Sequence, residues 1–177
     1  FFPTVSSGPI DRSRRFFDDI KTIMPREAYL ELAGTGVYRV ILGLLYKIMF
    51  STYVYQMLSA LKNTGTLTYS VKYMYLYTLY LFFDFAGYSL MAVGSSNILG
   101  IQTPMNFNKP FLSIDIKDFW TRWHITLSTW LRDFVFSRVL MNAMKKKMFK
   151  NRLQNASFAY MVNMCVMGFW HGLSISY

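Results

Sequence analysis

Two histidines are the residues of this chain whose chemistry stands out, because their neighbours along the chain are mostly apolar. His124 and His171 are the only histidines among 177 residues. A neutral imidazole can lie in apolar surroundings without the full penalty of a buried charge, and it can accept a proton near neutral pH. The two side chains are therefore the first candidates for proton transfer.

Other reactive groups offer less. The chain has no Gly-x-Ser-x-Gly turn and no glycine-rich phosphate loop. Two histidines with no carboxylate or thiol beside them make a poor metal site, so no metal is expected. Cys165 is the single cysteine, which excludes an internal disulfide. It lies about 240° around a helix from His171, and we expect it to be part of the core.

His124 belongs to the stretch 118–134, which contains three of the four tryptophans and neither glycine nor proline. Its apolar residues recur at helical spacing on one broad stripe, with the histidine at or beside it. Asp115 or Asp118 can cap the start. We expect one continuous amphipathic helix, suited to a membrane interface or to packing on other apolar helices. The alternative is a packing helix whose histidine is only hydrogen-bonded.

The composition indicates a membrane protein. Hydrophobic residues make up 53%, aromatic residues 19% and charged residues 16%, with a net charge of +10. The basic residues flank long apolar runs and no nucleic-acid motif is present, so nucleic acid is not an expected partner. The chain has no initiating methionine and no signal-peptide pattern. We expect it to be an internal piece of a longer membrane protein.

Two long apolar segments can cross the ~30 Å hydrocarbon core of a membrane. They cover residues 27–62 and 69–94. Arg39 and Lys47 in the first must snorkel, pair or face an aqueous cavity. Asp84 in the second is either paired with one of these cations or a tyrosine hydroxyl, or takes part in the chemistry.

Two further segments are irregular. Residues 1–26 combine turn residues with mixed charges and an apolar edge, which predicts a loop and a short surface or interfacial helix. Residues 95–114 are polar and interrupted by glycine and proline, which predicts a re-entrant or capping loop. Asn106, Asn108 and Lys109 could contact a polar substrate there, although turn chemistry explains them equally well.

A run of cations without any acid follows the central stretch, and we call it the basic patch: Arg138, Lys145, Lys146, Lys147, Lys150 and Arg152. The positive-inside tendency places it in the cytoplasm, and it could also dock an acidic partner. Residues 153–177 contain no Asp, Glu, Lys or Arg, so they are the best spanning candidate. His171 would then lie ~24 Å along the helix from Asn155, beyond the midplane.

Several motifs together resemble the membrane-bound O-acyltransferase superfamily. The two histidine motifs, Phe119–Asp133 and Gly168–Gly172, carry the most specific resemblance. Phe1-Phe2-Pro3 with Gly8-Pro9-Ile10, and Asn106–Phe111, also match. Within the superfamily, Phe82–Asn97 and the basic stretch make the chain most similar to the teichoic acid D-alanyltransferases of Gram-positive bacteria rather than to alginate O-acetyltransferases.

The resemblance implies an all-α fold, a polytopic transmembrane helical bundle with interfacial and re-entrant helices and a tunnel or funnel to a buried site. Residues 1–177 would form a single, partial membrane domain of a bacterial plasma-membrane enzyme. Such an enzyme would move D-alanine from the phosphopantetheine arm of a small acidic carrier protein to lipoteichoic acid, with no bound cofactor. His171 corresponds to the essential histidine of the family and His124 to the second one.

These implications give the expected site. His171 would be the general base for the acceptor hydroxyl, and His124 would position the arm or polarise the carbonyl, without an acyl-enzyme. The expected substrate- or tunnel-lining residues are Trp120, Trp123, Trp170, Asn106 and Asp84. The expected carrier-docking residues are Arg138, Leu140, Met141, Lys145, Lys146 and Lys147. The alternatives are O-acetyl transfer to an exopolysaccharide and a non-catalytic membrane transporter fragment with structural histidines.

Overall fold

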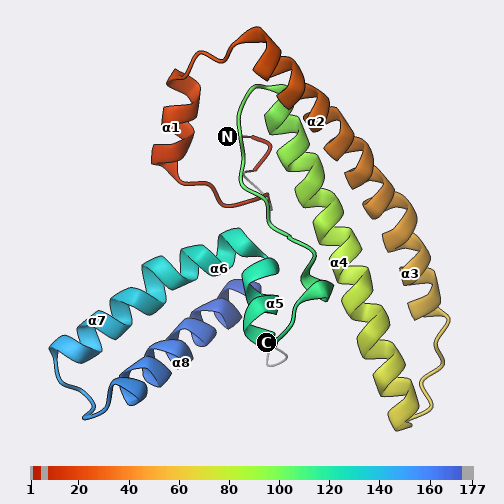
Figure 1. The fold of residues 1–177 in the computed structure, drawn as a ribbon. Helices are drawn as coiled ribbons and strands as arrows, with labels where there is room; N and C mark the ends of the chain where they lie inside the picture. The colour runs from red at the N-terminus through yellow and green to blue at the C-terminus, as the bar shows by residue number, and fades with distance from the viewer. Residues whose placement is uncertain (1, 5–7, 173–177) are drawn as a thin grey trace. The chain divides into compact units, whose positions relative to one another are not determined.

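A computed structural model describes residues 2–4 and 8–172 (Figure 1). All regular elements in this part of the chain are helical, so the all-α prediction is confirmed. The contacts divide the chain into two compact units, of which unit 1 ends at Lys109 and unit 2 begins at Pro110.

Unit 1 is built on a pair of long antiparallel helical rods. The first rod is continuous through α2 (Arg26–Leu44), the π-helical η1 (Leu45–Phe50) and α3 (Ser51–Ser59). The second rod is α4 (Leu67–Ile98), and it runs beside the first in the opposite direction (Figure 1). Thr66 caps α4 by accepting a hydrogen bond from the Tyr69 amide at 3.3 Å.

Among the described residues, two helical stretches are long and apolar enough to cross a membrane, Arg26–Ser59 and Leu67–Ile98. Large apolar side chains such as Tyr38, Ile48 and Tyr75 are exposed along them, as lipid-facing residues are. Both predicted spans are therefore confirmed as helices of spanning length. The spanning role predicted for 153–177 stays a prediction, because residues 173–177 lie outside the described part.

Glycines let the two rods of unit 1 touch backbone to backbone. A Cβ added at Gly43 would lie 2.6 Å from the Gly87 carbonyl oxygen, and one added at Gly94 would lie 2.6 Å from the Gly36 oxygen. All four glycines are buried. The helices can approach this closely only where side chains are absent, so these residues form a glycine seam.

Three charged residues inside the spans, Arg39, Lys47 and Asp84, have polar partners. Lys47 on η1 donates to Asp84 on α4 in an ion pair. Asn97 is buried, and with its amide oxygen turned toward α2 it accepts from Arg39 Nη1 at 2.5 Å. The structural pairing predicted for Asp84 is confirmed, and it lowers the cost of a carboxylate at membrane depth.

The chain after α4 runs back along that helix. The Phe107 ring packs edge to face on Phe82 and Phe85, with centroid distances of 5.6 and 5.2 Å. Phe82 lies about 24 Å along the helix axis from Ile98, so the segment returns to the middle of the span. Asn106 is fully buried in it. A returning loop of this kind agrees with the predicted re-entrant or capping segment.

The N-terminal part of unit 1 contains the predicted short helix, α1 (Ser13–Lys21). Phe17 and Ile20 are exposed on it, which suits an interfacial position. Arg15 Nη1 donates to Asp19 at 3.1 Å. The Asp19 carboxylate also accepts the Gln102 amide at 2.9 Å, which joins α1 to the returning segment.

Unit 2 consists of short helices and one longer one. In chain order they are η2 (Pro110–Leu112), α5 (Ile116–Arg122), α6 (Ile125–Leu131), the π-helical η3 (Arg132–Phe136), α7 (Ser137–Lys145) and α8 (Arg152–His171). The helices α6, η3 and α7 follow one another without interruption, and α8 returns antiparallel beside them (Figure 1).

The helix α8 buries one stripe against its neighbours. Asn155, Ala159 and Asn163 are buried on it at a spacing of four residues. Cys165 is exposed, so the expectation that it belongs to the core is wrong. It follows Asn163 by two positions, or about 200° around the helix, and therefore lies on the opposite side from the buried stripe.

Candidate active site

The central stretch is a broken helix, not the single continuous helix that its sequence predicts. The helix α5 ends at Arg122 and α6 begins at Ile125. Between them Trp123 is extended, and His124 has φ 45° and ψ 51°, in the left-handed region. Few residues other than glycine adopt this conformation, and in folded proteins it is concentrated at functional sites.

Local contacts hold the two sides of the break. Asp115 caps α5 by accepting the Asp118 amide at 2.6 Å, as one of the two predicted caps. The Trp123 ring stacks on Phe119 with a centroid distance of 5.5 Å. After the break, the Ser128 hydroxyl donates to the Trp123 carbonyl at 3.3 Å. These contacts involve the backbone and side chains on both sides of the left-handed His124.

The break brings the His124 ring close to the end of α8. The Trp170 ring lies edge to face with His124 at 6.0 Å and with His171 at 4.9 Å between centroids. The two predicted catalytic histidines therefore share one aromatic neighbour, although 47 positions separate them in the sequence.

A backbone contact determines the tautomer of His171. Its Nδ1 lies 2.8 Å from the carbonyl oxygen of Met167. A carbonyl oxygen can only accept, so Nδ1 carries the proton and donates. In the neutral ring Nε2 is then the basic nitrogen. His171 is exposed, so a substrate can reach this nitrogen.

His124 differs from His171 in its protonation. It lies outside both candidate spans and is half-buried. Burial, and to a smaller extent the nearby His171, lower the pKa of His124 to about 4. His124 is therefore neutral at physiological pH, so it can donate or accept a hydrogen bond but does not act as a cation.

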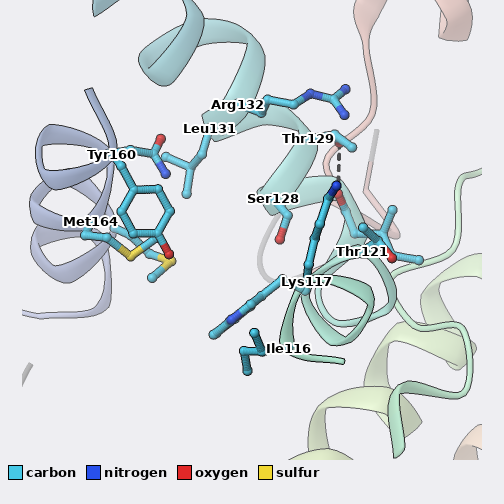
Figure 2. A pocket seen from close by; sticks show the side chains of 13 residues that line it. Ile116, Lys117, Thr121, Ser128, Thr129, Leu131, Arg132, Tyr160 and Met164 are labelled. Atoms are coloured by element: carbon cyan, nitrogen blue, oxygen red, sulfur yellow. Dashed lines mark hydrogen bonds between the residues drawn. The ribbon is translucent and has the colours of Figure 1, made fainter. Parts of the chain in front are cut away.

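A cavity of about 630 Å³ lies within unit 2. Figure 2 shows Tyr160 and Met164 projecting from α8 toward Ser128 on α6. Ile125, which follows His124, lines it, and so does Met167, whose carbonyl binds His171. The chain neighbour of His124 and the hydrogen-bond partner of His171 thus both belong to the cavity wall.

The structure divides the other predicted site residues between the units. Trp120 lines the cavity, and Trp170 contacts both histidines. Trp123 is in the wall of aromatic rings around the break. Asn106 and Asp84 belong to unit 1, where Asp84 is paired with Lys47.

The predicted carrier-docking residues lie on α7 and the turn after it. Arg138, Met141, Lys145, Lys146 and Lys147 are exposed and Leu140 is half-buried. The Arg138 guanidinium lies 5.4 Å from the centroid of the Phe134 ring. This face therefore combines positive charge with exposed apolar side chains.

Asn163 is a cavity residue that the sequence reasoning missed. It is buried and lines the cavity from α8. The signal was present, because Asn155 and Asn163 are the polar members of a stripe with a four-residue spacing in an apolar helix. A polar residue repeated on one face of such a helix indicates a polar neighbour.

The whole chain, residues 1–177, matches the model of the membrane-bound O-acyltransferase family. It is 48% identical over 181 residues to the teichoic acid D-alanyltransferase of Bacillus subtilis (strain 168) and 46% identical over 184 residues to that of Streptococcus thermophilus. It is 33% identical over 179 residues to the probable alginate O-acetylase AlgI of Pseudomonas putida.

These alignments cover 100%, 100% and 99% of this chain but only 46%, 44% and 35% of the respective relatives. The chain therefore spans less than half the length of the relatives it matches. The part it spans contains both histidine motifs.

Proposed function

We propose that this chain, which belongs to the membrane-bound O-acyltransferase family, carries the reactive centre of an enzyme that transfers D-alanine to teichoic acid. The observation that supports it most directly is the meeting of His124 and His171 at one tryptophan beside a cavity. The relatives at 48% and 46% identity are named for this reaction. The setting would be the bacterial plasma membrane, crossed several times by the whole protein.

In the proposed reaction, His171 Nε2 removes the proton from a hydroxyl of the acceptor as the hydroxyl oxygen attacks the thioester carbonyl. The new C–O ester bond forms, the C–S bond breaks, and the proton passes to the departing sulfur. Neutral His124 would hydrogen-bond the carbonyl oxygen or hold the donor in place. Direct transfer of this kind needs no covalent acyl-enzyme.

The proposed donor is D-alanine carried as a thioester on the phosphopantetheine arm of a small acidic carrier protein. The exposed cations on α7 and the following turn support this choice, because the segment 134–177 contains no acidic residue. Opposite charges steer two proteins together and orient them. The proposed acceptor is lipoteichoic acid on the other side of the membrane.

O-acetyl transfer to a polysaccharide is the second candidate. The observation that favours it is the match to a probable alginate O-acetylase over 99% of the chain, at 33% identity. The higher identity to the D-alanyltransferases places it second. Parallel assays with D-alanyl and acetyl donors would separate the two reactions.

The test uses the full-length protein in lipid nanodiscs, with lipoteichoic acid and carrier loaded with labelled D-alanine. Replacing His171 with Ala should lower the transfer rate by about 10²–10⁴-fold, while carrier binding stays unchanged. Cys165→Ser is the matched control on the same helix and should keep the wild-type rate. Wild-type transfer by the His171→Ala variant would contradict the proposed role.

A further inference from the structure

Asn163 has an unmet hydrogen-bonding need inside the cavity of unit 2. Its side chain is 9% exposed, and its Oδ1 atom has no hydrogen-bond partner among the described residues. Leaving a buried polar atom without a partner is costly, and native proteins rarely do so without a reason. Because Asn163 lines the cavity, a ligand in the cavity can supply the missing donor.

The other lining residues indicate the remaining chemistry of this ligand. Lys117 and Arg132 bring positive charge to the cavity, and no described residue that lines it is acidic. Arg132 also pairs through Nε with Asp133, which is outside the lining, at 2.9 Å, so Lys117 is the lining cation without a carboxylate partner among the described residues. Figure 2 shows both cations on the same side of the cavity as Thr129. Trp120, Met164 and Met167 supply apolar walls. The matching ligand has an anionic group, a flexible apolar part and a hydrogen-bond donor.

The position of Asn163 relates this ligand to the reaction. Asn163 precedes His171 by eight residues on α8, which is about 12 Å along the helix axis. Met167 lies between them, lining the cavity and accepting the His171 hydrogen bond. A ligand whose reacting end is at His171 can therefore have a second polar group near Asn163.

We propose that Asn163 is a specificity-determining residue, whose Oδ1 accepts a hydrogen bond from a flexible phosphodiester ligand while Lys117 and Arg132 attract the phosphate. The inference rests on the proposed function, because both substrates of that reaction are flexible phosphodiesters with hydrogen-bond donors. The pantetheine arm has amide N–H donors and a phosphodiester, and a polyglycerol phosphate has hydroxyl donors beside its phosphodiesters.

The experiment measures binding to the full-length protein in nanodiscs with two probes, pantetheine 4′-phosphate and a short glycerol phosphate oligomer. Asn163→Leu removes the polar atom at similar volume and leaves no buried group unsatisfied, so it should fold. It should weaken binding of one probe by roughly 3- to 10-fold, as expected for a lost neutral hydrogen bond. Met161→Leu is the control on the same helix, at an exposed position outside the cavity lining, and should change binding by less than about 2-fold.

The phosphate contact is tested in the same assay with pantetheine that lacks the phosphate. Lys117→Gln should weaken binding of the phosphorylated probe and leave the unphosphorylated probe unaffected. If Asn163→Leu affects only the pantetheine probe, the ligand is the donor arm, and if it affects only the glycerol phosphate probe, the ligand is the acceptor.

Equal binding of both probes to the wild type and to Asn163→Leu would overturn the proposal. This outcome is distinct from failure of the proposed function, which the transfer assay measures separately. If the wild-type protein binds a probe through Asn163 but transfers no D-alanine, the binding site proposed here stands and the proposed reaction is wrong.

Discussion

The two units use backbone geometry in opposite ways. In unit 1, α4 continues for 32 residues, and the glycine seam holds it against α2 by direct backbone contact. In unit 2, the 27 residues from Pro110 to Phe136 are divided among four short helices, η2, α5, α6 and η3. A residue with left-handed backbone, His124, separates α5 from α6. Unit 1 is helical without a break along its packing surface, and unit 2 is interrupted where the chemistry is proposed.

The difference shows what each task requires. Long apolar helices pack well when their surfaces match along the whole length, so regularity stabilises unit 1. A reactive site needs side chains from separate elements aimed at one point, which a break in the helix provides. Unit 1 departs from regular α-helix at η1, where Lys47 meets Asp84, in keeping with the association of π-helical segments with functional positions.

The largest expected effect is on the glycine seam. A Cβ at Gly87 would lie 2.8 Å from the Gly43 oxygen and 2.8 Å from the Lys47 amide nitrogen, both backbone atoms that cannot move aside. Gly87→Leu should therefore destabilise the protein by about 3 kcal/mol or more, measured by thermal unfolding of the full-length protein in detergent. Gly34 has nothing within 4 Å of its added Cβ, so Gly34→Ala is the control and should be neutral or slightly stabilising. Equal stability of the two variants would show that close backbone contact at the glycine seam does not stabilise unit 1.

The next effect is the dependence of stability on pH through His124. Its pKa in the folded protein, about 4, is below the ordinary value of 6.5. Its contribution is therefore fully present above about pH 6.5 and is lost as the pH falls toward 4, by roughly 1–3 kcal/mol. Unfolding of the wild type and of His124→Gln should be compared between these pH values. The wild type should lose more stability on acidification, and parallel curves would show that His124 is not buried as the structure has it.

The Lys47–Asp84 pair should give a smaller coupling. Both side chains are more than a third exposed, at 37% and 39%, so the two rods hold them loosely and the expected coupling is modest. Lys47→Met and Asp84→Leu should each destabilise the protein, and the double variant should be less destabilised than the sum by about 1 kcal/mol. A thermal-unfolding double-mutant cycle measures this. Additive effects would mean that the Lys47–Asp84 ion pair contributes no coupling energy to stability.

The smallest effect concerns the backbone at His124 itself. At φ 45° a residue with a Cβ is strained, and glycine is not. His124→Gly and His124→Ala both remove the imidazole, but the glycine variant should be more stable by about 1 kcal/mol. The comparison of their unfolding midpoints isolates the backbone from the side chain. An alanine variant of equal or higher stability would indicate that the break closes into a continuous helix.

Much of the fold follows from local patterns that the sequence displays. The apolar runs predicted the rods of unit 1, and Asp115 was one of the two predicted caps of α5. A pairing of Asp84 could be expected, with Arg39, Lys47 or a tyrosine hydroxyl as candidates, because an isolated carboxylate is costly at membrane depth. The two histidines could be selected as reactive groups from residue type alone, because imidazole is the side chain that ordinarily exchanges a proton near neutral pH.

The break at His124 could not be predicted in the same way. Residues 118–134 contain no glycine or proline, so local propensity favours a continuous helix. In the broken helix, Trp123 packs on Phe119 and also on Phe111, whose ring centroid is 6.3 Å away. Contacts between residues distant in sequence can outweigh a propensity of less than about 1 kcal/mol per residue.

What the sequence by itself determined is the set of apolar helices, the pairing need of the charges within them and the identity of the two imidazoles. Those features depend on the transfer of single side chains out of water, which is a property of each residue type and its neighbours along the chain. Only the tertiary structure decided that Gly43 faces Gly87, that His124 leaves the helix, and that Trp170 joins it to His171. These depend on which surfaces meet, and the free energy of a contact exists only once both partners are in place.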